Sequence, residues 1–105
     1  MSNKKILLLG ANGFLGSKLL ELAPNDIELW LSYRGQKINN YQKQVKIDLL
    51  DFNSLRKQLK KIKPQIVIHA ARIHPLDKDP VKANEVMQEL AKIIKSIGAK
   101  LIYIS

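Results

Sequence analysis

The sequence contains no cysteine, few aromatic residues and no long hydrophobic run. The lack of cysteine excludes disulfides and thiolate metal sites and is typical of a reducing compartment, so we expect a cytoplasmic protein. No apolar stretch approaches the roughly 18 residues of a membrane-spanning helix, and the apolar run after Lys4 and Lys5 is too short for a signal peptide. The 105 residues have room for one domain with one hydrophobic core.

Acidic residues are also scarce. There are 9 Asp and Glu against 18 Lys and Arg, which gives a formal net charge of +9. A nucleic-acid-binding domain is one interpretation of this charge. However, the lysines lie on the polar sides of amphipathic segments without interleaved aromatic residues, which favours a solvated surface and no nucleic-acid partner. The two histidines lack the carboxylate spacing of a metal site.

What the sequence does contain is a glycine-rich turn close to its start. Four apolar residues, Ile6 to Leu9, run into glycines at positions 10, 13 and 16. Gly10 allows a sharp turn after a buried strand, Gly13 allows the backbone to approach a phosphate, and Gly16 allows the next helix to pack closely. Amide groups at the start of that helix would face an anion. This order predicts a dinucleotide pyrophosphate site; the alternative is a glycine turn without a ligand.

Strand and helix patterns alternate along the whole chain. Strands are expected over residues 5–9, 27–32, 45–47, 65–69 and 100–104, and helices over 14–22, 52–62 and 81–97. Asp51 or Asn53 would cap the second helix, and Gly98 would end the third. The alternation predicts an α/β fold, a Rossmann-like doubly wound parallel sheet with strand order 3-2-1-4-5. Ligands of such sheets bind beyond the carboxyl ends of the strands, at the switch between the first and fourth strands.

The end of the second expected strand bears on which nicotinamide cofactor binds. An acidic residue there bonds the adenosine ribose and repels a 2′-phosphate, but this chain has Ser32, Tyr33 and Arg34 instead. Arg34 would pair with a 2′-phosphate, so NADP is the expected cofactor and NAD the alternative, unless Arg34 is only a solvated loop residue. After the third strand, Asp48 would accept from the adenine amino group beside Leu49, or would cap the next helix.

Small residues follow the fourth expected strand. Ala70 and Ala71 would let the backbone run beneath the ribose and nicotinamide. His69, which precedes them, is interpreted as a packed, hydrogen-bonded strand residue rather than a base.

Several of these segments resemble one family. They are GANGFLG at residues 10–16, DLLD at 48–51, PQIVIHAA at 64–71 and LIYIS at 101–105. Together they resemble the N-terminal half of an extended short-chain dehydrogenase/reductase. Leu76-Asp77-Lys78 resembles its dTDP-4-dehydrorhamnose reductase branch, which includes the regulatory β subunit of methionine adenosyltransferase.

The resemblance implies three groups of contacts with the dinucleotide. The glycine turn would line the pyrophosphate, the end of the third strand would hold adenine, and the end of the fourth strand would lie along the ribose and nicotinamide. Together with Arg34, the candidate cofactor-binding residues are Gly10, Asn12, Gly13, Phe14, Leu15, Arg34, Asp48, Leu49, Ala70, Ala71 and Arg72.

The resemblance assigns no catalytic residue to this chain. The family's catalytic Ser or Thr would follow Ser105, and its Tyr-x-x-x-Lys pair lies further on. We therefore expect residues 1–105 to form an incomplete NAD(P)-binding Rossmann domain, truncated after the fifth strand. Its full-length parent would be an NADP-dependent oxidoreductase that reduces a nucleotide-linked keto sugar. The alternative is a non-catalytic binding module like the regulatory relative.

Two surfaces predict self-association. The fifth strand would be an open edge of the sheet, and the helix over residues 81–97 has an apolar stripe wide enough for two partners. We therefore expect a homodimer through that helix or through the exposed fifth strand.

Overall fold

The apolar run before the glycine turn forms the central strand of a parallel sheet. The computed structural model describes residues 4–10, 18, 21–22, 26–33, 43–69 and 79–103. Its strands are β1 (Lys4–Leu9), β2 (Ile27–Tyr33), β3 (Gln44–Lys46), β4 (Ile66–His69) and β5 (Lys100–Tyr103), and its helices are α2 (Phe52–Ile62) and α3 (Pro80–Ser96). Of the helix expected over 14–22, the described residues 18, 21 and 22 are helical, and the others lie outside the described part.

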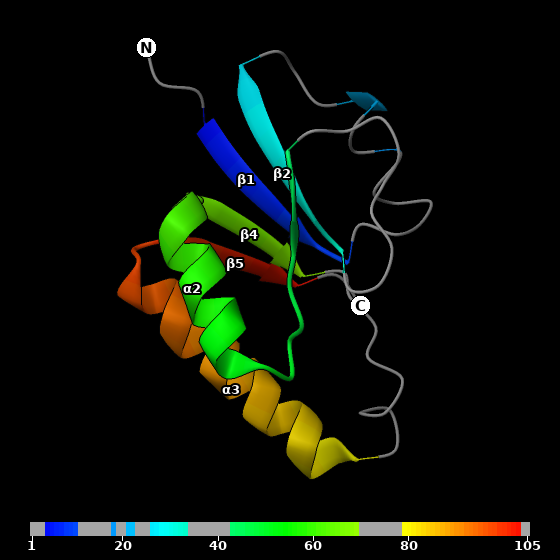
Figure 1. Ribbon diagram of the computed structural model, residues 1–105, viewed down its shortest axis with the longest axis vertical. Helices are drawn as coiled ribbons and strands as arrows, with labels where there is room; N and C mark the ends of the chain where they lie inside the picture. Colours follow the sequence, from blue (N-terminus) through cyan, green and yellow to red (C-terminus); the bar gives the residue numbers. More distant parts are fainter. Residues whose placement is uncertain are drawn as a thin grey trace.

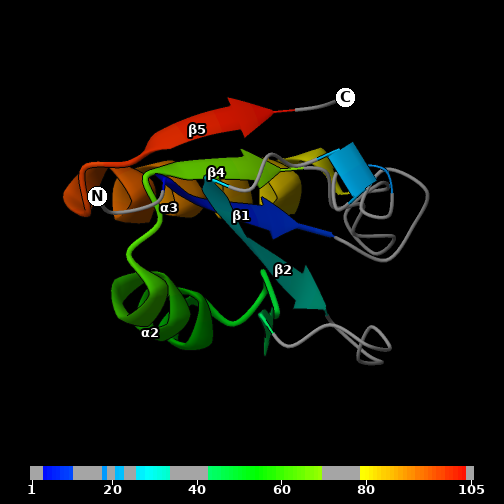
Figure 2. The same cartoon turned by 90° about the horizontal axis from the view of Figure 1, so that it is seen from above.

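The five strands are all parallel and lie in the order β3-β2-β1-β4-β5. Figure 1 shows β1 between β2 and β4, and Figure 2 shows the same succession with β5 at one edge. The strand order reverses at β1, since the chain builds outward to β3 and then returns to pair β4 with β1. The expected Rossmann-like sheet with order 3-2-1-4-5 is therefore confirmed.

α2 has the bounds that its apolar spacing predicts. The Asp51 carboxylate accepts a hydrogen bond from the Ser54 amide at 3.1 Å, which satisfies one of the free amides of the first turn. Leu55 and Leu59 lie one turn apart and are fully buried. The helix ends at Lys63, whose backbone is left-handed (φ 54°) directly before Pro64.

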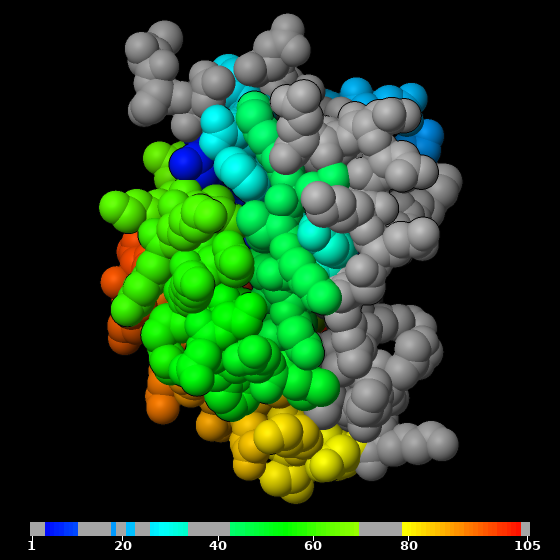
Figure 3. All heavy atoms as spheres, in the orientation of Figure 1, coloured from blue at the N-terminus to red at the C-terminus, as the bar shows by residue number. Residues whose placement is uncertain are grey.

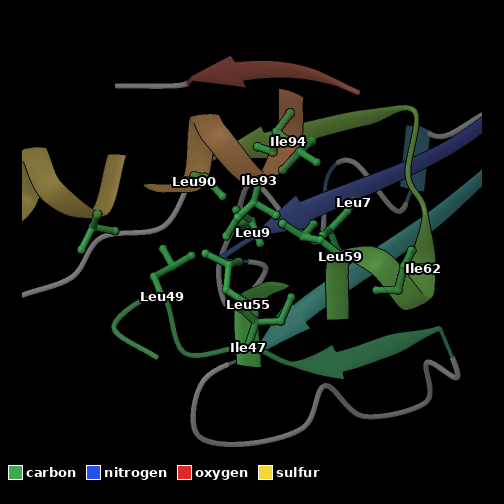
Figure 4. Close-up of a cluster of buried hydrophobic side chains, with 12 residues drawn as sticks. Leu7, Leu9, Ile47, Leu49, Leu55, Leu59, Ile62, Leu90, Ile93 and Ile94 are labelled. Atoms are coloured by element: carbon green, nitrogen blue, oxygen red, sulfur yellow. The ribbon is translucent and has the colours of Figure 1, made fainter. Parts of the chain in front are cut away.

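Both described helices pack on one face of the sheet. Leu7 and Leu9 of β1 point between α2 and α3 into a single cluster of buried apolar side chains (Figure 4). Leu8, which alternates with them, is also fully buried but lies outside that cluster. β1 is therefore covered on both faces, as a central parallel strand should be.

The apolar stripe of α3 belongs to this core. Its buried residues are Val86, Leu90, Ile93 and Ile94. Met87 and Ile97 pack against the same cluster. The stripe is thus used inside the domain, which leaves β5 rather than α3 as the apolar surface for the expected homodimer.

In the space-filling view α2 forms a large part of the front surface, with α3 below it (Figure 3). Within the part of the chain that the structure describes, neither helix is long and apolar enough to cross a membrane.

Candidate functional site

The glycine turn begins at the carboxyl end of the central strand. Gly10 follows Leu9 with a φ of 85°, a conformation that side chains with a Cβ rarely adopt. Gly10 therefore has the backbone conformation that the expected sharp turn requires. The residues that follow it lie outside the described part, so the turn itself stays a prediction. The Gly10 amide donates a hydrogen bond to the Ser32 hydroxyl oxygen at 3.2 Å. Gly10 is thus tied to the neighbouring strand β2.

Ser32 is a positioning residue that the sequence does not reveal. It is only 4% exposed, and its hydroxyl oxygen meets an amide 22 positions away in the chain. The one local signal is a small polar side chain near the end of an otherwise apolar strand. Through this hydrogen bond Ser32 helps to hold the Gly10 backbone in position.

Asp48 lies at the same end of the sheet, just beyond β3. Its Oδ1 accepts from the Leu50 amide at 3.0 Å, and its carbonyl accepts from the Asp51 amide at 3.0 Å. The cap of α2 is Asp51, so the alternative role of Asp48 as the helix cap is wrong. Instead, Asp48 holds a tight turn with a half-buried carboxylate. Its contact with adenine stays a prediction.

Leu49 is a core residue. Its side chain is 6% exposed and lies in the apolar cluster with Ile47 and Leu55 (Figure 4). Little of that side chain is left to contact a ligand. Its place beside adenine also stays a prediction.

His69 ends β4 between Leu9 of β1 and Tyr103 of β5. The ring is 4% exposed, and its centroid lies 5.1 Å from that of the Tyr103 ring. Burial lowers the pKa of His69, and no described residue offers its Nδ1 a hydrogen-bond partner. Its interpretation as a packed strand residue is confirmed, but the expected hydrogen bond is not found at Nδ1.

The remaining candidate contacts lie outside the described residues. They are Asn12, Gly13, Phe14, Leu15, Arg34, Ala70, Ala71 and Arg72. Their roles stay predictions. The described neighbours nevertheless converge, because parallel register brings the carboxyl ends of β1, β2, β3 and β4 to one edge of the sheet. Gly10, Asp48 and His69 therefore lie at or next to the same edge.

The chain does contain one Tyr-x-x-x-Lys spacing, at Tyr33 and Lys37. On a helix this spacing places both side chains on one face. Tyr33 is instead the last residue of a strand, so the spacing does not form the helical catalytic pair there. Nor do the described residues contain a group of His, Asp or Glu side chains that could hold a metal ion.

Solved structures share this fold. A hypothetical dTDP-4-dehydrorhamnose reductase from Sulfolobus tokodaii is 28% identical with a TM-score of 0.76, over 96% of this chain and 38% of that one. Thermus thermophilus UDP-glucose 4-epimerase, solved with NAD, is 25% identical with a TM-score of 0.70, over 92% and 36%. A Bacillus anthracis dTDP-4-dehydrorhamnose reductase solved with NADP has the same fold at 22% identity and a TM-score of 0.69, over 100% and 37%.

The chain therefore spans well under half the length of these proteins. No curated protein sequence matches it. A family model described as the RmlD substrate binding domain matches residues 4–105. With this match over nearly the whole sequence, and the parallel sheet described above, the chain belongs to the RmlD substrate-binding domain family.

Proposed function

We propose that the chain is the dinucleotide-binding part of an NADP-dependent reductase that acts on a nucleotide-linked keto sugar. The observation that carries the proposal is the position of Gly10. It turns with positive φ off the central strand, at the point where the strand order reverses. In doubly wound sheets this is the place where a pyrophosphate is held.

The candidate residues divide the cofactor between them. Gly10, Asn12, Gly13, Phe14 and Leu15 would surround the pyrophosphate, Arg34 the 2′-phosphate, Asp48 and Leu49 the adenine, and Ala70, Ala71 and Arg72 the ribose and nicotinamide. The bound nicotinamide would supply hydride for reduction of a carbonyl. The catalytic acid and most substrate contacts would belong to the rest of a full-length parent.

Two findings support this class of substrate. The family match covers residues 4–105, and the Sulfolobus tokodaii relative is described as a dTDP-4-dehydrorhamnose reductase. The Thermus thermophilus epimerase, which also acts on a nucleotide sugar, is solved with NAD, and the Bacillus anthracis reductase with NADP. Both cofactors thus occur with this fold, so the choice of NADP rests on Arg34 and the lack of an acidic residue beside it.

Titration of the protein with NADPH and NADH tests the proposal. Wild-type protein should bind NADPH more tightly by about tenfold, because a cation bonded to the 2′-phosphate contributes about 1.5–3 kcal/mol. Arg34→Ala should remove this difference. The matched control is Lys57→Ala, which removes an exposed cation on α2 and should leave both affinities unchanged.

The outcomes of this titration separate two levels of the proposal. Binding of neither nucleotide would refute the dinucleotide site. Equal wild-type affinities for the two would refute only the preference for NADP.

The second candidate is a non-catalytic NADP-binding module. It is kept because the resemblance assigns no catalytic residue to positions 1–105. A Tyr-x-x-x-Lys motif on a helix downstream of Ser105 in the gene product would favour the reductase, whereas a longer product without it would favour the binding module. A cytoplasmic location remains part of the proposal and rests on composition alone.

A further inference from the structure

We infer that Lys46 of β3 helps to distinguish NADP from NAD by binding the 2′-phosphate of the adenosine ribose. The inference rests on the proposed function and extends it to a second strand. It follows from the register of β3, the direction of the Lys46 side chain and the charges around it.

Register places Lys46 beside the last residue of β2. Lys46 is aligned with Tyr33, and the Ile47 amide donates to the Tyr33 carbonyl at 3.0 Å. In dinucleotide-binding folds the residue at the end of this second strand lies next to the ribose 2′ position. The backbone bond between β3 and Tyr33 therefore fixes Lys46 near the atom that distinguishes the two cofactors.

The side chain of Lys46 lies on the same face of the sheet as that of Tyr33. Val45 and Ile47 both pack into the core beneath α2 and α3, so the residue between them points to the opposite face. In β2, Trp30 packs against that core, and the same alternation turns Tyr33 away from it. Lys46 and Tyr33 thus share one face at the carboxyl end of the sheet.

The charge of Lys46 is available to a ligand. Its side chain is exposed on an edge strand, and no described carboxylate lies within ion-pair distance of it. Lys43, just before the opposite end of β3, differs because it lies 3.9 Å from a carboxylate oxygen of Glu28. A flexible lysine ammonium binds phosphate as a point charge, whereas the fork of Arg34 would bind it through paired hydrogen bonds.

Adenosine 2′,5′-bisphosphate and AMP are the sharpest probes, because they differ only in the 2′-phosphate. Lys46→Gln should weaken binding of the bisphosphate and of NADPH about five- to tenfold, while AMP and NADH change less than about twofold. Lys46→Arg should restore the bisphosphate affinity. Lys43→Gln is the matched control, because Lys43 directly precedes the other end of β3 and pairs with Glu28. Its loss should not change the ratio of the two affinities.

The ratio of bisphosphate to AMP affinity separates a specificity role from a structural one, since partial unfolding would weaken both ligands together. An unchanged ratio in Lys46→Gln, with wild-type preference for the bisphosphate intact, would overturn the role of Lys46 alone. Equal wild-type affinities for the two probes would overturn the role together with the NADP preference. Failure of wild-type protein to bind NADPH or NADH would overturn the proposed function as well.

Discussion

His69 is a buried titratable side chain at the end of β4. Its ring is almost wholly buried, it stacks at a tilt on Tyr103, and no described group accepts or donates at Nδ1. A protonated imidazole there would lose much of its hydration. Burial therefore lowers the pKa of His69 in the folded protein relative to the unfolded chain.

The lowered pKa of His69 predicts that the folded protein loses stability in acid. As the pH falls below about 6.5, the unfolded chain takes up the His69 proton before the folded protein does. The free energy of unfolding should thus be highest above this pH and decrease from there down to the folded-state pKa. Urea unfolding between pH 5 and 8 measures this slope, and His69→Phe should reduce it. An equal slope in wild type and variant would contradict the role of His69.

At the scale of single residues, the local sequence predicted what kind of contact a residue makes better than it predicted which residue it contacts. The positive φ of Gly10 and the cap at Asp51 follow from residue chemistry within one turn of chain. The hydrogen bond from Gly10 to Ser32 joins residues 22 positions apart, and the sequence around either residue does not identify the other as its partner. The roles of the two acids in the DLLD segment became distinct only in the structure. Asp48 accepts from the Leu50 amide in a turn, whereas Asp51 accepts from the Ser54 amide and caps α2.

At the scale of elements, α2 offers a clean test of capping. Asp51→Ala removes the acceptor for the Ser54 amide, and we expect the free energy of unfolding to fall by about 1 kcal/mol. Asp51→Ser keeps a capping oxygen, so the free energy of unfolding of this variant should fall only slightly. Chemical denaturation measures both variants. Equal stability of the Ala and Ser variants would show that the cap does not matter.

The predicted bounds were most accurate where the sequence carries clear start and stop signals. α2 was predicted to the residue because Leu55, Leu59 and Ile62 repeat at helical spacing between clear start and stop signals. β3 was displaced by one residue, since it is a short edge strand with a single apolar residue within its bounds. In β2, Trp30 packs on the core and Ser32 is buried, although neither is aliphatic.

At the scale of the whole molecule, strand order was predictable because strand–helix alternation and right-handed crossovers leave few arrangements. The order β3-β2-β1-β4-β5 in turn places Gly10 and Asp48 at one edge. The cofactor contacts of Arg34, Ala70 and Arg72 depend on side-chain positions outside the described residues. They therefore remain predictions from the resemblance and from charge.

The edge of the sheet predicts how the polypeptide behaves in solution. β5 is an outer strand of the described sheet, and its Ile102 side chain is 46% exposed. We propose that two copies of the 105-residue chain associate through β5, since unpaired strand edges attract other strands.

Sedimentation at increasing concentration tests this association. Wild-type protein should form dimers. Ile102→Lys places a charge on the edge of the sheet and should raise the protein concentration at which half of the chains are dimeric by about tenfold or more. Val81→Lys changes another exposed apolar residue, at the start of α3, and is the control because Val81 is 71% exposed and lies outside β5. Wild-type protein that stays monomeric throughout would exclude the dimer.

The pairing of β1 with β4 also determines when this sheet can be completed. Ile6 aligns with Ile66, so the two central strands meet only after nearly sixty intervening residues have been made and gathered. Closing so long a loop slows folding, because its entropy is lost before the contacts form. On the ribosome, β1 can first pair only with β2, and one side of the edge that we propose to bind the nucleotide stays open to water until β4 has emerged.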